Sequence, residues 1–197
     1  MTPDSLLSIG VGLALAAAAG FRVFVPLLAL SLAAQSGWVE LTPSFAWLAS
    51  TAATLALATA TAIEIAAYYI PFFDNALDTL AAPVAVLAGI VASASVLTDL
   101  PPWLQYSIAI VGAGGTAGAV HAATSVVRLK SSVATAGFGN PIVATLELIG
   151  SLLVAGLALV APFIALAAVV VCVAIVAKRV NAWRLASVRG AAQSSTR

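Results

Sequence analysis

Apolar residues in this chain follow one another in long stretches that lack the alternation typical of strands. A bilayer core of about 30 Å is crossed by about 20 apolar residues in a helix. The sequence predicts about six transmembrane helices, at residues 6–34, 45–70, 76–97, 104–127, 142–160 and 163–177. Because alternating segments are absent, a β-barrel is not expected. The pattern therefore predicts an all-α integral membrane protein.

The composition agrees with this prediction and excludes several classes of protein. Hydrophobic residues make up 62% of the 197 residues and charged residues 8%, whereas soluble domains carry roughly 25% charged residues. A soluble enzyme and a disordered chain are therefore excluded. The net charge of +1 gives no strong field toward nucleic acid, so membrane lipids are the expected partners.

Residue types that carry metal, redox or hydrolytic chemistry are scarce. Cys172 and His121 are the single cysteine and the single histidine, so neither an intrachain disulfide nor a zinc site is expected. No serine–histidine, paired-aspartate or HExxH pattern is present. We therefore expect no metal, no cofactor and no enzymatic activity.

Basic residues predict the orientation in the membrane. Two of them, Arg128 and Lys130, follow the fourth apolar stretch, and a cluster follows the sixth: Lys178, Arg179, Arg184, Arg189 and Arg197. Basic loops face the cytoplasm. With six single crossings, both groups lie on the cytoplasmic side, and the N- and C-termini are both expected there.

The two halves of the chain resemble each other. The register that aligns the first helix of each half places Arg22 opposite His121. The connections are shorter in the second half, and when this is allowed for, Glu64 aligns with Glu147. Three helices in each half is an odd number, so the sequence predicts two inverted repeats, as in many secondary transporters. The first repeat, the second repeat and a cytoplasmic basic tail are expected at residues 1–99, 100–180 and 181–197. We expect the first segment of each repeat to be broken.

Ionisable side chains inside apolar stretches are the candidate site residues, because each costs about 2.5–3.5 kcal/mol to insert. The candidates for binding a substrate or ion are Arg22, Glu64, Glu147, His121, Asp78, Asp74 and Tyr68. Glu64 and Glu147 form either a carboxylate pair that binds a cation or protons, or one structural ion pair each. In the structural alternative, Arg22 pairs with Glu64, and His121 pairs with Glu147.

Arg22 lies between Gly20 and Pro26, two residues that favour a helix break. A broken helix exposes backbone groups inside the membrane, and a guanidinium there suits a carboxylate or a phosphate. The alternative is an arginine that snorkels from an ordinary tilted helix.

Asp74 and Asp78 lie one turn apart at the predicted start of the third helix. Asp74 is expected to stabilise the helix N-terminus, whereas Asp78 is deep enough to line a cytoplasmic mouth with Glu64. Tyr68 lies one turn beyond Glu64 on the same face and is able to hydrogen-bond to it.

Small residues and prolines are the candidates for packing and hinge positions. Gly114 and Gly118 form a GxxxG pattern, which favours close helix packing within the chain or across a homodimer. The full set of packing and hinge candidates is Gly20, Pro26, Pro71, Gly114, Gly118, Asn140 and Pro141.

Several motifs in combination resemble one protein family. They are Gly20-Phe21-Arg22-Val23-Phe24-Val25-Pro26; Glu64 with Tyr69-Ile70-Pro71, Asp74, Asp78 and Pro83; and Gly139-Asn140-Pro141 with Glu147. The chain, to about residue 180, resembles small bacterial polytopic inner-membrane proteins catalogued as a domain of unknown function (DUF4126-like). The resemblance implies a multi-pass protein of the bacterial inner membrane and supplies no activity.

Three functions from different classes remain open. The first is a small inverted-repeat transporter or permease, coupled to protons or another cation. Its polar site at the middle of the membrane is expected to contain Arg22, Glu64, Glu147 and His121. The second is a lipid or lipid-phosphate translocator in which Arg22 binds the phosphate. The third is a structural or assembly protein without transport, in which the buried charges are fully paired and no cavity reaches them.

Overall fold

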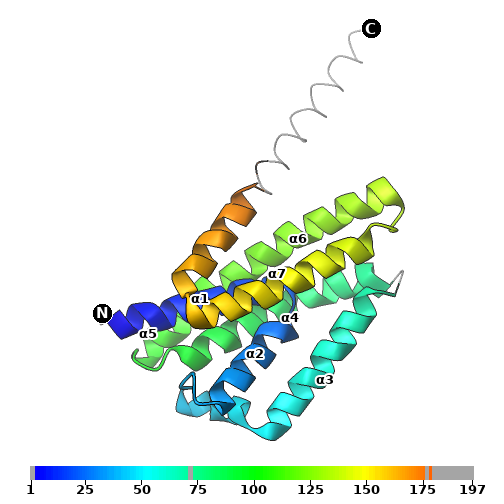
Figure 1. The fold of residues 1–197 in the computed structure, drawn as a ribbon. Helices are drawn as coiled ribbons and strands as arrows, with labels where there is room; N and C mark the ends of the chain where they lie inside the picture. The colour runs from blue at the N-terminus through cyan, green and yellow to red at the C-terminus, as the bar shows by residue number, and fades with distance from the viewer. Residues whose placement is uncertain (1–2, 71–72, 176–177, 179–197) are drawn as a thin grey trace.

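The computed structural model describes residues 3–70, 73–175 and 178, with the backbone alone for residues 73–79. In these residues the chain is helical between short connections and contains no strand. The labelled helices in Figure 1 are α1 (Pro3–Phe21), α2 (Phe24–Gln35), α3 (Thr51–Tyr68), α4 (Phe73–Val96), α5 (Pro102–Ser107), α6 (Gly114–Thr135) and α7 (Asn140–Val160). Three further segments are a 3-10 helix (Pro43–Ala49), a π-helical segment (Ile108–Ala113) and a last helix (Pro162–Ile175). The predicted all-α class is confirmed for the described residues.

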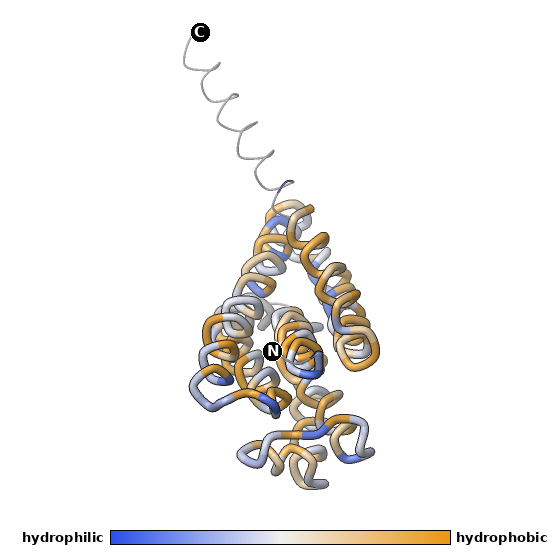
Figure 2. The backbone as a smooth tube through the Cα atoms, turned by 90° about the vertical axis from the view of Figure 1, so that its left-hand side faces the viewer, coloured by the Kyte–Doolittle hydropathy of each residue, from blue (hydrophilic) through white to orange (hydrophobic). Residues whose placement is uncertain are grey.

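Four helices are long and apolar enough to cross a membrane. They are Pro3–Phe21, Thr51–Tyr68, Asn140–Val160 and the continuous helix Pro102–Thr135, which joins α5 to α6. The shorter apolar helices are Phe24–Gln35, Leu80–Val96 and Pro162–Ile175. Figure 2 shows hydrophobic positions along most of the length of the helices. These features support a membrane protein.

Local chemistry accounts for several helix starts. Pro43, Pro102 and Pro141 lie in the first turn of their helices, where a missing backbone N–H costs nothing. At the start of α3, the Ser50 hydroxyl accepts a hydrogen bond from the Ala53 N–H at 3.1 Å, which satisfies one of the unpaired amides of the first turn.

The turn between α6 and α7 falls between the predicted helices 104–127 and 142–160. Ala136 and Gly137 have positive φ angles of 50° and 88°, the left-handed conformation that ends many helices. The Asn140 side chain bonds with the Ser132 hydroxyl. Asn140 therefore ties the start of α7 to the last turns of α6.

Helix α1 is central and packs against α4, α6 and α7. Its contacts are close because they involve small residues. A Cβ atom added at Gly20 would lie 2.6 Å from the backbone oxygen of Ala117, and one added at Gly89 would lie 2.7 Å from the Cβ of Ala117. The predicted packing role of Gly20 follows from this crossing of α1 and α6.

The GxxxG pair of α6 faces α4 within the same chain. A Cβ atom at Gly114 would lie 3.1 Å from the Ile90 side chain, and one at Gly118 would lie 3.3 Å from the Val86 side chain. Of the two alternatives for these glycines, close packing within the chain is the one observed.

The first predicted segment is divided into two helices that run in opposite directions. The chain leaves α1 after Phe21 and enters α2 at Phe24, so the predicted break is confirmed in this half. Gly12 in α1 packs against Ser93, and the Thr42 N–H, after α2, donates to the Ser95 carbonyl. Both neighbours lie at the end of α4, so α1 and α2 form a helical hairpin. Pro26 lies in the first turn of α2 and is buried.

The inverted repeat is not confirmed. Helices that are paired in such a repeat must run in opposite directions, but α1 and α6 are parallel. Leu13 lies near Gly112, and Gly20 lies near Val120 further along both helices. The first segment of the second half is also continuous through its π-helical segment, Ile108–Ala113, rather than broken.

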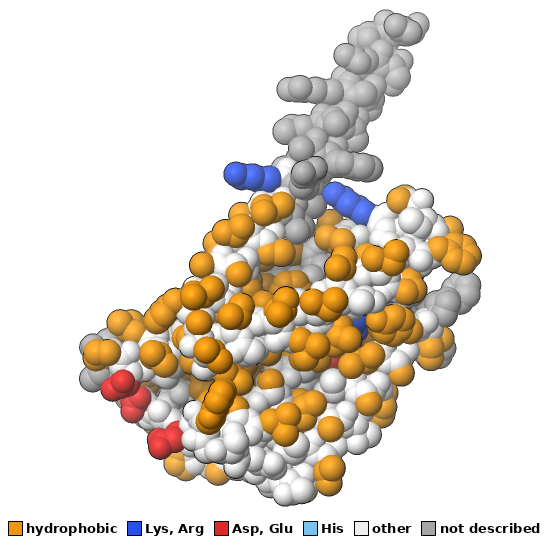
Figure 3. All heavy atoms as spheres, in the orientation of Figure 1, with side chains coloured by type: hydrophobic (Ala, Val, Ile, Leu, Met, Phe, Trp, Pro, Cys, Tyr) orange, Lys and Arg blue, Asp and Glu red, His pale blue; other side chains and the backbone are white. Residues whose placement is uncertain are grey.

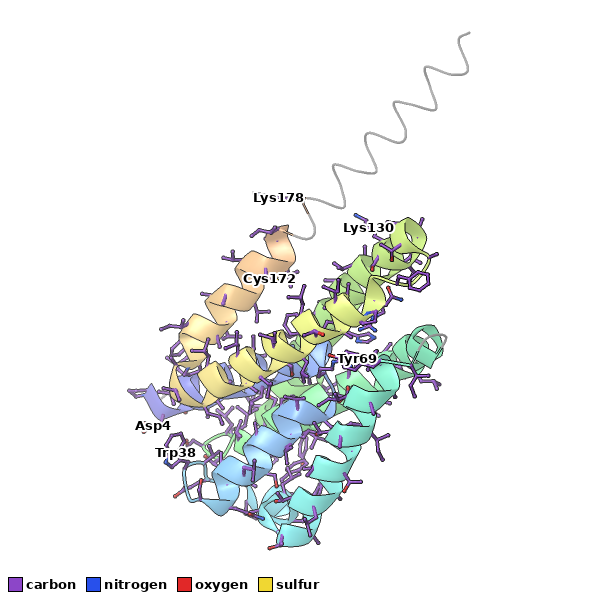
Figure 4. All side chains as sticks on the ribbon, turned by 45° about the vertical axis from the view of Figure 1, so that its right-hand side comes forward. Asp4, Trp38, Tyr69, Lys130, Cys172 and Lys178 are labelled. Atoms are coloured by element: carbon purple, nitrogen blue, oxygen red, sulfur yellow. The ribbon has the colours of Figure 1, made fainter. Side chains whose placement is uncertain are left out.

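The two ends of the helix bundle carry different side chains. Asp4 and Trp38 lie at one end and Lys130 and Lys178 at the other (Figure 4). On the face shown in Figure 3, acidic side chains gather at the first of these ends and basic side chains at the second. We call them the tryptophan end and the lysine end. The hairpin returns the chain to the tryptophan end, where α1 begins. The start of α1 and the lysines therefore lie at opposite ends of the bundle, whereas six single crossings would place them at the same end.

Candidate functional site

Arg22 lies at the tip of the α1–α2 hairpin and is almost fully buried, with 1% of its side chain exposed. Its Nη2 donates to the Ala144 carbonyl of α7 at 2.8 Å and lies 3.8 Å from Oε2 of Glu147. The break between the two helices places Arg22 inside the bundle, too deep for its charge to reach water.

Arg128 of α6 and Glu147 of α7 form a buried ion pair. The guanidinium carbon of Arg128 lies 4.4 Å from the centre of the Tyr68 ring, and that of Arg22 lies 3.9 Å from the same centre. Aromatic rings attract cations placed over their faces. Tyr68 therefore stabilises both guanidinium groups, and α3, α6, α7 and the hairpin tip converge at one charged cluster.

The Glu64 carboxylate binds backbone rather than an arginine. Oε1 accepts the Val23 N–H at 2.8 Å, and Oε2 accepts the Phe24 N–H at 3.1 Å. These amides begin α2, where backbone N–H groups have no partner within the helix and carry partial positive charge. Glu64 therefore fastens α2 to α3. The ion pair expected between Arg22 and Glu64 is replaced by the contact of Arg22 with Glu147.

His121 is buried on α6 and interacts electrostatically with Glu64. It also lines a groove between α4 and α6 together with Pro83 and Ser125. The structure thus places His121 beside the charged cluster, on the opposite side of α6 from the cavity described below.

Three predicted residues lie wholly or partly outside the description. Pro71 is outside the described residues. Asp74 and Asp78 lie in the first turns of α4, where the backbone alone is described. Their predicted roles at a helix start and at a cytoplasmic mouth stay predictions.

Arg128 is the member of the cluster that sequence reasoning missed. Its position after the fourth apolar stretch favoured a role in orientation, yet only 2% of its side chain is exposed. One signal was available, because Arg128 follows His121 by two helical turns and therefore shares its face of α6.

A cavity of about 440 Å³ lies beside the cluster, between α6, α7 and the last helix. Phe21 of the hairpin tip closes one wall, and most lining residues are aliphatic, among them Val120, Val154 and Val169. Among the described residues that line it, Glu147 is the one charged group. The cavity is therefore apolar along its walls and meets the charged cluster at Glu147.

Arg22 retains hydrogen-bonding capacity. Its Nε and Nη1 are buried and make no hydrogen bond within the part of the chain that the structure describes. Buried donors normally have partners. Arg22 and Arg128 together balance the formal charges of Glu64 and Glu147, so the four groups sum to zero.

No curated protein and no solved structure matches the sequence of this chain. The model of one family, described as a domain of unknown function (DUF4126), matches residues 9–181, a span that includes the hairpin, the charged cluster and the cavity. The chain therefore belongs to the DUF4126 family.

Proposed function

We propose that this protein is a membrane translocator of an amphipathic, lipid-like molecule. The apolar part of the substrate occupies the cavity between α6, α7 and the last helix, and its polar head lies at the charged cluster. The observation that carries this proposal is the meeting of an apolar cavity with Glu147, which contacts Arg128 and Arg22. Ligand sites commonly combine apolar walls with a few convergent polar groups.

The alternatives are supported less well by the same geometry. An assembly protein without transport is expected to pair its charges fully and to have no cavity at them, but a cavity reaches Glu147 and two Arg22 nitrogens lack partners among the described residues. A hydrophilic solute without an apolar part would leave the mostly aliphatic walls of the cavity without a matching partner. Coupling to a proton is compatible with the lipid-like substrate.

The proposed orientation places the lysine end in the cytoplasm, following the distribution of basic residues. The tryptophan end then faces outward, and the α1–α2 hairpin enters the membrane from that side. Glu147 lies two turns into α7, about 10 Å from the start of the helix. The head site therefore lies on the cytoplasmic side of the middle of the bilayer, whose core is about 30 Å thick. The membrane we propose is the bacterial inner membrane.

Filling the cavity tests the proposal. Gly150 of α7 lines the cavity, and a Cβ atom there has its nearest neighbours in the Phe21 ring, at 3.7 Å or more. Gly150→Phe is expected to place its ring in the cavity and to abolish both the co-purification of lipid and the transfer of fluorescent lipid between leaflets of reconstituted vesicles. Native mass spectrometry and a dithionite-quenching assay measure the two effects.

Gly156→Phe is the matched control. Gly156 lies on the same helix with no atom within 4 Å of an added Cβ, and it does not line the cavity. We expect this variant to keep bound lipid and transfer. Equal activity in the two variants, or a wild-type protein that neither binds nor moves lipid, would contradict the proposed function.

A further inference from the structure

Building on the proposed function, we propose that Glu147 occupies the place of an anionic substrate head. A phosphodiester or carboxylate head group replaces the Glu147 carboxylate on Arg22 and Arg128. The displaced carboxylate takes up one proton from water and becomes a neutral carboxylic acid. Each bound anionic head is thereby coupled to one proton.

The geometry of the cluster supports an exchange of this kind. Oε2 of Glu147 is held by Arg128 and lies 3.8 Å from Nη2 of Arg22. Guanidinium groups bind carboxylates and phosphates through the same planar arrangement of N–H donors. Glu147 also lines the cavity, so a head group attached to an apolar tail in the cavity reaches the same position.

Arg22 has the donors that a larger head group requires. Its Nε and Nη1 have no hydrogen-bond partner among the described residues. Solvent does not replace such a partner, because only 1% of the side chain is exposed. A carboxylate offers two oxygens, whereas a phosphodiester offers two non-bridging oxygens that share one negative charge and two ester oxygens. The additional acceptors would satisfy donors that Glu147 leaves unused.

Charge balance explains why a proton accompanies the anion. The formal charges of Arg22, Arg128, Glu64 and Glu147 sum to zero, with His121 counted as neutral. An added anion would leave an uncompensated negative charge at low dielectric, which is costly. Protonation of Glu147 restores the balance. Among the described side chains, the other titratable groups at the cluster are His121 of α6 and Tyr68 and Glu64 of α3.

Binding of defined lipids at different pH values tests the exchange. The probe is short-chain phosphatidylglycerol, whose phosphodiester keeps a single negative charge across the neutral range. Diacylglycerol with the same chains is the uncharged comparison, and inorganic phosphate is the comparison without a tail. The full-length protein in neutral detergent is titrated with each probe, and the dissociation constant is measured at several values between about pH 6 and pH 9.

In the wild-type protein, we expect the affinity for phosphatidylglycerol to fall as the pH rises, by up to about tenfold for each pH unit, which is the limit for uptake of one proton. In Glu147→Gln the proton is no longer needed, so binding is tighter at pH 9 and independent of pH. Arg22→Gln is expected to lose the preference for phosphatidylglycerol over diacylglycerol while retaining diacylglycerol. Glu40→Gln, an exposed carboxylate outside the cluster, retains the wild-type pH dependence.

The same pH dependence in wild type and Glu147→Gln would overturn the exchange, as would equal affinity for the charged and uncharged lipids. Diacylglycerol binding that persists in those cases leaves the proposed translocator intact, whereas failure of every lipid to bind removes both proposals. Binding of inorganic phosphate as tight as that of phosphatidylglycerol would identify a free anion rather than a lipid head as the ligand, and would contradict the lipid part. Thermal unfolding of each variant establishes that it is folded.

Discussion

Glu64 illustrates how one side chain supports an interruption of helical structure inside an apolar bundle. A broken helix leaves backbone N–H groups without partners, which is costly in lipid. The two carboxylate oxygens of Glu64 accept the N–H groups of Val23 and Phe24. A single carboxylate on α3 therefore stabilises the break that carries Arg22 into the charged cluster.

Removing this carboxylate is expected to loosen the start of α2. Hydrogen bonds to a charged group contribute about 2 kcal/mol, so in Glu64→Ala the amides of Val23 and Phe24 should exchange with deuterium roughly 30-fold faster. Glu64→Gln keeps one carbonyl acceptor and should give an intermediate rate. Hydrogen–deuterium exchange with mass spectrometry measures these rates.

Thr59→Ala provides the control for this experiment, because the Thr59 side chain is exposed and its hydroxyl donates to the Leu55 carbonyl within α3. Exchange at Val23 should stay at the wild-type rate in this variant. If Glu64→Ala also leaves exchange at α2 unchanged, the stabilising role of Glu64 is wrong.

The helices of this protein approach one another closely where small residues meet. Without a hydrophobic drive between helices in lipid, association depends on close packing. Gly20 of α1 meets Ala117 and Val120 of α6, and Gly89 of α4 meets Ala117. The crossing of α1, α4 and α6 thereby holds Arg22, at the end of α1, beside the part of α6 that carries Arg128.

Two glycine substitutions should have effects of opposite sign. In Gly20→Ala the new Cβ would lie 2.6 Å from the Ala117 oxygen, so we expect a loss of about 1–3 kcal/mol in the free energy of unfolding. In Gly115→Ala no atom lies within 4 Å of the new Cβ, and the higher helix propensity of alanine should stabilise by up to about 1 kcal/mol. Reversible unfolding in mixed detergent micelles measures both. Equal effects would show that the α1–α6 contact does not limit stability.

The two ends of the bundle carry different side chains, and the proposed orientation in the membrane follows from this difference. Exposed tryptophans lie in the connections near the start of α3, in the loop after α2 and at the start of α5: Trp47, Trp38 and Trp103. Such rings favour the headgroup level. Lys130 and Lys178 mark the opposite end (Figure 4). The hairpin contributes two helices, α1 and α2, that begin and end toward the tryptophan end of the bundle.

Cysteine labelling tests this orientation. In a Cys172→Ser background, Ser36→Cys lies beside Trp38 and Phe138→Cys lies in the exposed turn between α6 and α7. A membrane-impermeant maleimide applied to intact spheroplasts should label Ser36→Cys. It should label Phe138→Cys only after the membrane has been permeabilised. Labelling of both variants from the same side would contradict the assignment of opposite ends to opposite membrane faces.

Much of the helical organisation was predictable because its causes are local. Each of the six predicted apolar stretches contains described helix, and the break between Gly20 and Pro26 occurs at Arg22 and Val23. Proline and glycine act on the backbone within a few residues. The burial of Glu147 was predictable for a similar reason, since it lies inside an apolar stretch.

The pairing of the charges was not predictable from local pattern. Arg128 lies close enough to the end of an apolar stretch to resemble an orientation signal, whereas the structure buries it against Glu147. The repeat alignment suggested His121 at that place, because it set Arg22 opposite His121 and Glu64 opposite Glu147. The parallel packing of α1 and α6 does not support that alignment.

The local chain thus dictates which segments are helices, where the first segment breaks and which charges are surrounded by apolar neighbours, because helix length, proline and insertion cost act over a few turns. The direction of α2 after the break, the partner of Glu147 and the cavity between α6, α7 and the last helix depend on contacts between residues far apart in sequence. A break at Arg22 is compatible with a bend or with a reversal. The packing of α1 among three other helices and the hold of Glu64 on α2 select the reversal.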